Sequence, residues 1–210
     1  MMKFGFGLRG IGKELPPLII AEMSGNHNQS LARALDIVEA AAKTGAHALK
    51  LQTYTADTMT LDVSNEAFSI DDPNSQWAGK SLYELYHEAH TPWEWHKEIF
   101  KEAKKNRLSF FSSPFDETAV DFLEKIGCQA YKIASPEINH TPLIERVSKT
   151  KKPVILSTGL ANYSEIKRAV SILSKNKSNK IIILKCCSSY PADYDELNLL
   201  TIKEIRNKEK

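Results

Sequence analysis

Six short apolar segments of the chain each run directly into a polar turn that carries chemically useful side chains. With their turns, these segments are AEMSGNHN, LKLQTY, FFSSPF, YKIASPE, ILSTG and LKCCSSYP. Stretches with helical spacing of apolar residues separate most of them, so strands and helices alternate along the chain. This alternation predicts a parallel sheet, and a parallel (β/α) barrel places its catalytic groups at the carboxyl ends of its strands. We therefore expect the six turns to surround one substrate.

The fold class that follows is α/β, a TIM-type (β/α) barrel truncated after six βα units, because a complete barrel has eight strands. Residues 1–17 are expected to form an N-terminal extension that caps the barrel as a hairpin, and residues 18–210 an incomplete barrel domain. The strands are predicted at residues 18–23, 47–52, 108–112, 130–134, 154–157 and 181–186. The helices are predicted at residues 30–44, 117–126, 164–174 and 198–207, with others opened by Thr91-Pro92 as a capping box and by Thr141-Pro142.

Composition excludes several other classes of protein. Of the 210 residues, 42% are hydrophobic, which is enough to bury a core. The formal net charge of +2 provides no field that would select nucleic acid or an acidic membrane. No apolar run approaches the roughly 20 residues that cross a bilayer. The three cysteines do not have the spacing of a metal site, and the N-terminal segment has no signal-peptide core. Both observations favour a cytoplasmic protein.

Two lysines lie within predicted strands. Lys50 and Gln52 are two residues apart, so both point to the same side of their strand. Lys132 lies in an otherwise apolar segment, where an unpaired ammonium is costly to bury. Each lysine alone fits a structural role, either reaching solvent or pairing with a core carboxylate. Two of them near hydroxyl-rich turns favour a phosphate or carboxylate ligand.

Several polar residues follow the strands. The two carboxylates Glu22 and Glu137 either orient sugar hydroxyls and move protons, or serve as a rim residue and a helix-start residue. His27 has no histidine at metal-site spacing and is expected in a hydrogen-bonded turn. Hydroxyls that fit phosphate binding, or act simply as helix caps, are Ser112, Ser113, Ser135, Ser157, Thr158, Ser188 and Ser189.

The remaining candidates are cysteine and aromatic residues. Cys186 and Cys187 are expected to be buried, because no histidine and aspartate accompany them for nucleophilic catalysis. Tyr190 either closes a sugar pocket or braces its turn. Trp77, in the long polar excursion over residues 53–90, is the best candidate for a lid contact.

Seven longer motifs resemble the sialic acid synthase family in order and spacing. They are AEMSGNHNQ, LKLQTYTADTMTL, SLYELYHEAHTPWEWH, FFSSPFDETAVDFLE, AYKIASPEI, KPVILSTGLA and LKCCSSYP. The resemblance covers essentially residues 18–200. Within the family, LYELY…TPWEWH and KCCSSYP most resemble the pseudaminic acid synthases. Ser188, where neuraminate synthases commonly have asparagine, and the turn MSGNHN favour the same branch.

The resemblance implies condensation of phosphoenolpyruvate with an acetamido sugar to a nine-carbon α-keto acid. Glu137 matches the family position for proton transfer, and Glu22 is the second candidate catalytic carboxylate, facing the sugar. Residues matching or grouped with the substrate-binding positions are Lys50, Gln52, Ser113, Phe115, Lys132, Ser135, Ser157, Ser188 and Tyr190.

The resemblance also implies a divalent metal, Mn²⁺ or Mg²⁺, and a homodimer in the complete enzyme. The family's metal-binding histidines lie on the seventh and eighth strands, and a C-terminal antifreeze-like domain completes the partner's site. Neither is expected within these 210 residues, so we expect the chain alone to be inactive. Three alternatives stay open: a neuraminate or legionaminate synthase, an aldolase that forms a Schiff base on Lys50 or Lys132, and a catalytically incomplete fragment.

Overall fold

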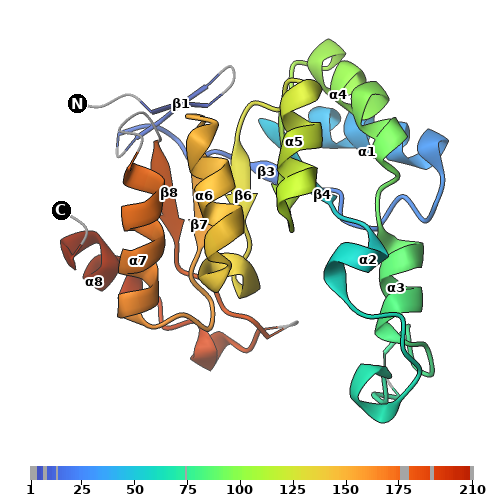
Figure 1. Cartoon of the computed structure of the whole chain (residues 1–210). Helices are drawn as coiled ribbons and strands as arrows, with labels where there is room; N and C mark the ends of the chain where they lie inside the picture. Colours follow the sequence, from blue (N-terminus) through green and yellow to red (C-terminus); the bar gives the residue numbers. More distant parts are fainter. Residues whose placement is uncertain are drawn as a thin grey trace. The chain divides into compact units, whose positions relative to one another are not determined.

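The computed structural model describes residues 4–6, 9–12, 14–73, 75–175, 180–189 and 192–208 (Figure 1). The chain separates into two compact units, Met1–Gln129 and Ala130–Lys210. Each unit has its own parallel strands and its own covering helices. No helix in the described part of the chain has the length and apolar character needed to cross a membrane.

The first unit contains an antiparallel hairpin and three parallel strands. The hairpin pairs β1 (Phe4–Phe6) with β2 (Arg9–Ile11), inside the predicted N-terminal extension. The parallel strands lie in the order β3 (Ile20–Glu22), β4 (Ala48–Thr53) and β5 (Ser109–Pro114). The helical segments are α1 (Leu31–Lys43), α2 (Ala56–Met59), η1 (Glu66–Phe68), α3 (Leu82–Ala89), η2 (Trp93–Trp95), α4 (His96–Lys105) and α5 (Glu117–Lys125).

The second unit repeats the alternation of strand and helix. Its parallel strands lie in the order β6 (Tyr131–Ile133), β7 (Val154–Ser157) and β8 (Ile181–Leu184). Helices α6 and α7 pack side by side (Figure 1). The helical segments are η3 (Pro136–Asn139), α6 (Thr141–Lys149), α7 (Tyr163–Ser174), η4 (Tyr194–Glu196) and α8 (Thr201–Lys208).

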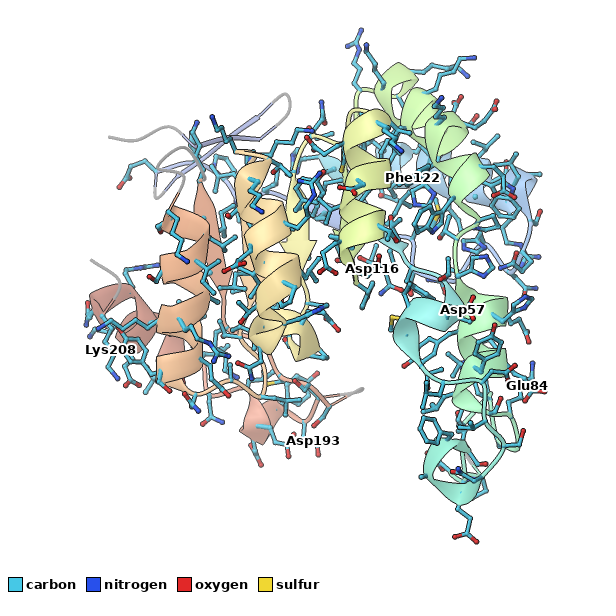
Figure 2. All side chains as sticks on the ribbon, in the orientation of Figure 1. Asp57, Glu84, Asp116, Phe122, Asp193 and Lys208 are labelled. Carbon is cyan, nitrogen blue, oxygen red and sulfur yellow. The ribbon has the colours of Figure 1, made fainter. Side chains whose placement is uncertain are left out.

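Local sequence explains why these elements begin and end where they do. The Ser30 hydroxyl accepts a hydrogen bond from a backbone N–H in the first turn of α1, and the Asp116 carboxylate does the same at α5 (Figure 2). Gly45 and Gly127 follow α1 and α5 with φ of 84° and 78°, the left-handed conformation that ends helices. Helix α7 buries the face that carries Ile166 and Ala169, as its 3.6-residue period predicts.

All six predicted strands are present, with boundaries that differ by at most two residues. The polar excursion was incompletely predicted, because it contains α2, η1 and α3. Helix α3 starts with a full capping box of Ser81 and Glu84, and the Tyr83 hydroxyl links it to α2 by a 3.0 Å hydrogen bond to Asp57. The capping box predicted at Thr91 is wrong, since Thr91 is not the N-cap and its side chain bonds elsewhere.

Candidate active-site residues in the two units

In the first unit, an ion pair links the carboxyl end of β3 to the middle of β4. Glu22 and Lys50 are paired in register, and the Lys50 Nζ lies 2.5 Å from Glu22 Oε2. The lysine side chain is 17% exposed and the glutamate 38%, so the pair lies at the edge of solvent. The anion that Lys50 requires is therefore supplied within the protein. A ligand that binds Lys50 must share it with, or displace, the Glu22 carboxylate.

The other predicted residues of this unit lie close by along the chain. Gln52 lies two residues beyond Lys50, and its Oε1 is 3.5 Å from the Ser24 hydroxyl, a weak hydrogen bond. Ser113 pairs in register with Gln52 and is buried. The ring of Phe115 meets the Tyr54 ring edge to face at 5.3 Å. Because Tyr54 is buried, its pKa rises to about 12 and the phenol stays neutral.

The sequence did not predict a buried hydrogen-bonded network around Thr53 and His96. The Thr53 hydroxyl lies 2.8 Å from His96 Nε2 and 2.6 Å from the Ser112 hydroxyl. His96 Nδ1 is 3.2 Å from the Pro92 carbonyl oxygen, which can only accept, so Nδ1 carries the proton. Burial lowers the pKa of His96 to about 4. A neutral imidazole thus ties the carboxyl ends of β4 and β5 to the start of α4.

His27 has the structural role that its sequence context predicts. Its side chain is buried, with Nε2 3.1 Å from the Thr91 hydroxyl and Nδ1 accepting from the backbone N–H of Gln29. The Trp95 ring packs edge-on at 5.5 Å. Burial lowers the pKa of His27, and the nearby His90 acts in the same direction. Thr91 and Trp95 of the TPWEWH motif therefore contact His27, and Thr91 does not cap a helix.

In the second unit, Lys132 lies at the centre of a polar cluster. Its ammonium donates to the Ser157 hydroxyl and, at 3.1 Å, to the Ile133 carbonyl oxygen. The Cys186 thiol donates to the same Ser157 hydroxyl at 3.2 Å. Residues at the ends of β6 and β7 and beyond β8 are therefore connected by hydrogen bonds. An ammonium beside hydroxyl groups is suited to an anionic ligand.

Near these strand ends, hydroxyl groups lie around Gly159. The Gly159 N–H donates to the Ser135 hydroxyl at 3.0 Å. A methyl group on Gly159 would lie 2.9 Å from the Ser135 Oγ and closer still to the Ser188 Oγ. The absence of a side chain is therefore what allows three chain segments to present hydroxyl and N–H groups together. We name Lys132, Ser135, Ser157, Gly159 and Ser188 the hydroxyl–lysine cluster.

Glu137 lies in η3, directly after β6, and is half-buried. Its Oε2 is buried and has no hydrogen-bond partner within the described residues. Burial raises the pKa of Glu137, opposed by its own backbone hydrogen bond and by the positive charges of His140 and Lys132. A carboxyl group of this kind holds a proton nearer neutral pH than an exposed glutamate does, as a general acid must.

Two further predictions have different outcomes. Burial of Cys186 and Cys187 is wrong, since both are partly exposed. Strand β8 ends at Leu184, so the two cysteines lie in the following loop and not in the sheet. Tyr190 lies outside the described residues. Within those residues, no group of three histidine, cysteine, aspartate or glutamate side chains fits a metal ion.

Replacing Gly159 with alanine is expected to weaken binding of inorganic phosphate about tenfold with little loss of stability. The new methyl group displaces the Ser135 and Ser188 hydroxyls, which rotate at small cost but no longer converge. Isothermal titration calorimetry measures the affinity. Gly12→Ala is the matched control, because its methyl group makes only ordinary contacts, 3.7 Å from Leu15. Equal affinities for all three proteins would contradict the role of the cluster.

Comparison with known proteins identifies the family of the chain. The profile of the NeuB family matches residues 37–210. A pseudaminic acid synthase of Helicobacter pylori is 44% identical over 90% of this chain and 55% of its own length. An N,N'-diacetyllegionaminic acid synthase of Campylobacter jejuni is 35% identical over 90% of this chain and 57% of its own length. The chain thus spans about half the length of the curated relatives it matches.

Solved structures show the same relationship. The crystal structure of an N-acetylneuraminic acid synthetase from Leptospira borgpetersenii superposes with a TM-score of 0.85 at 31% identity. The match covers 99% of this chain and 67% of that chain. The predicted fold class, a TIM-type (β/α) barrel represented by six βα units, is confirmed, as is the resemblance to the sialic acid synthases. The chain belongs to the NeuB family.

Proposed function

We propose that the chain carries the phosphoenolpyruvate-binding part of a synthase that joins phosphoenolpyruvate to an acetamido sugar. The product is a nine-carbon α-keto acid, with release of inorganic phosphate. The hydroxyl–lysine cluster of the second unit carries this proposal. It combines an ammonium, hydroxyls and a backbone N–H, the donors that phosphate and carboxylate oxygens require. The similarity to the pseudaminic acid synthase favours a trideoxy diacetamido sugar as the partner substrate.

The chemistry requires one new carbon–carbon bond and one broken phosphate ester. C3 of phosphoenolpyruvate attacks the aldehyde carbon of the open-chain sugar, and the aldehyde oxygen takes a proton. Water then adds to C2, and loss of phosphate leaves the ketone. Glu137 is suited to the proton transfer, since burial raises its pKa. In the complete enzyme, a homodimer in our proposal, Mn²⁺ or Mg²⁺ would polarise the aldehyde.

Calorimetric titration of the chain with phosphoenolpyruvate tests the proposal. We expect saturable binding that inorganic phosphate displaces. Because the chain spans about half the length of its relatives, we expect no turnover when sugar and Mn²⁺ are added. Absence of phosphoenolpyruvate binding would contradict the proposal, and robust turnover would contradict the expected inactivity.

The Schiff-base alternative is less well supported. Lys50 is held in an ion pair with Glu22, and a charged amine is not a nucleophile. Treatment with borohydride in the presence of pyruvate is therefore expected to leave the mass of the chain unchanged.

A further inference from the structure

The hydroxyl group of Ser157, the last residue of β7, has both of its acceptor positions filled. The side chain is buried. Its oxygen accepts one hydrogen bond from the Lys132 ammonium and a second from the Cys186 thiol, 3.2 Å away. A hydroxyl group has two acceptor lone pairs and one proton to donate. With both lone pairs occupied, the Ser157 hydroxyl can form a further hydrogen bond only as a donor.

The Cys186 thiol has two acceptor oxygens within reach. Ser157 Oγ lies 3.2 Å from the sulfur, and the Leu184 carbonyl oxygen lies 3.6 Å from it. A thiol sulfur is also a weak acceptor. If the thiol donated to Leu184, the Ser157 proton could turn toward the sulfur and would no longer be available to a ligand. The acceptor that the thiol chooses therefore fixes the direction of the Ser157 proton.

Thr158 makes the Leu184 oxygen a poor choice. The backbone N–H of Thr158 donates to the Leu184 carbonyl oxygen at 3.1 Å, and the Thr158 hydroxyl donates to the same oxygen at 2.9 Å. A carbonyl oxygen also has two lone pairs, so none is left for the thiol. The Cys186 proton is thereby directed to Ser157. The proton of the Thr158 hydroxyl, a candidate for phosphate binding from the sequence, is committed to β8.

We propose that Thr158 and Cys186 are positioning residues for Ser157: acting in series, they keep the Ser157 hydroxyl proton free for a bound oxyanion. The inference rests on the proposed function, because it explains how one donor of the hydroxyl–lysine cluster is oriented before phosphoenolpyruvate binds. Ionised phosphate and carboxylate oxygens accept hydrogen bonds, so a hydroxyl fixed as a donor suits them. A hydroxyl that must first reorient binds less tightly, since ordering it costs free energy on binding.

A double-mutant cycle, measured by calorimetric titration with phosphoenolpyruvate, tests the proposal. Cys186→Ala removes the donor to Ser157, and Thr158→Val frees a lone pair of Leu184 that the thiol can then use. Each should weaken binding about threefold to tenfold, the range of one neutral hydrogen bond. Because both act on one hydroxyl in series, the double variant should bind no more weakly than either single variant. Cys186→Ser and Thr158→Ser keep the donors and should restore most of the affinity.

Cys187→Ala is the matched control, because it removes the neighbouring thiol. The Cys187 sulfur lies 3.2 Å from Lys185 Nζ and 3.2 Å from the Glu196 carbonyl oxygen. Its removal should leave the affinity for phosphoenolpyruvate equal to that of the wild type.

The S–H stretching band in the infrared gives a second readout, which a merely structural role of these residues would not move. In the Cys187→Ala background, Thr158→Val should shift the band of Cys186, because the thiol changes its acceptor from Ser157 to Leu184. Thr158→Ser should leave the band in place. A band that stays unmoved in Thr158→Val overturns the inference.

The titrations keep the two proposals apart. If phosphoenolpyruvate binds but Cys186→Ala and Thr158→Val bind it like the wild type, or if their effects multiply in the double variant, the inference is overturned and the proposed function stands. If phosphoenolpyruvate fails to bind, the proposed function fails, and the same cycle with inorganic phosphate decides the inference; absence of phosphate binding overturns it too. Should Thr158→Val prove unfolded by circular dichroism, equal affinities of Cys186→Ala and Cys186→Ser overturn the inference.

Discussion

Replacing Lys132 with alanine is expected to weaken phosphoenolpyruvate binding about ten- to a hundredfold. The ammonium is the positive charge of the hydroxyl–lysine cluster, and it already orients the Ser157 hydroxyl. A hydrogen bond to a charged group contributes about 1.5–3 kcal/mol, and each 1.4 kcal/mol is a factor of about ten in affinity. The fold should survive, since the side chain is only partly buried. Calorimetry gives the affinities.

Lys167→Ala is the matched control, because Lys167 is exposed on α7 of the same unit and has the same charge. Its affinity should equal that of the wild type. Lys132→Arg should bind with intermediate affinity, because the charge remains while the planar guanidinium cannot take the position of the ammonium. If Lys132→Ala binds phosphoenolpyruvate as tightly as the control, the cluster has only a structural role at the strand ends. The proposed function then loses its main support.

The sequence was sufficient to predict the strands because each signal for them is local. A short apolar run bounded by turn residues marks a strand buried on both faces, and caps such as Asp116 mark the helices between them. Helix α3 was missed although its signal is equally local: Ser81 and Glu84 stand three apart before an apolar stretch. The prediction that Cys186 is buried was wrong, because the apolar run does not show where strand pairing stops.

The site was only partly predictable because its contacts join residues distant in sequence. The Lys50–Glu22 pair follows from strand register, which period-2 alternation alone does not give. The bond between Thr53 and His96 spans 43 positions, and nothing in the sequence around either residue identifies the other. The same holds for Trp77, whose place at the wall of a cavity in the first unit depends on how α3 packs.

Acidification is expected to destabilise the first unit through His96. Above pH 6.5 the imidazole is neutral in both the folded and the unfolded chain, so it adds no pH dependence. Between pH 6.5 and about 4, the unfolded chain binds a proton that the buried side chain refuses. The free energy of unfolding then falls by about 1.4 kcal/mol per pH unit, about 3 kcal/mol in total. Below pH 4 the imidazole is protonated in both states. The stability that neutral His96 provides at higher pH has then been lost in full, and the free energy of unfolding no longer changes through this residue.

Urea unfolding followed by tryptophan fluorescence measures this effect, because Trp77, Trp93 and Trp95 all lie in the first unit. His96→Asn is the informative variant: it is less stable at pH 7.5 but has no group that titrates at this position. Between pH 7.5 and 5.0, the wild type should lose about 2 kcal/mol more than His96→Asn. Glu102 and the other carboxylates are the same in both proteins, so their contributions cancel. Equal losses would show that His96 is not held neutral, and that the polar network beneath β4 and β5 tolerates its charge.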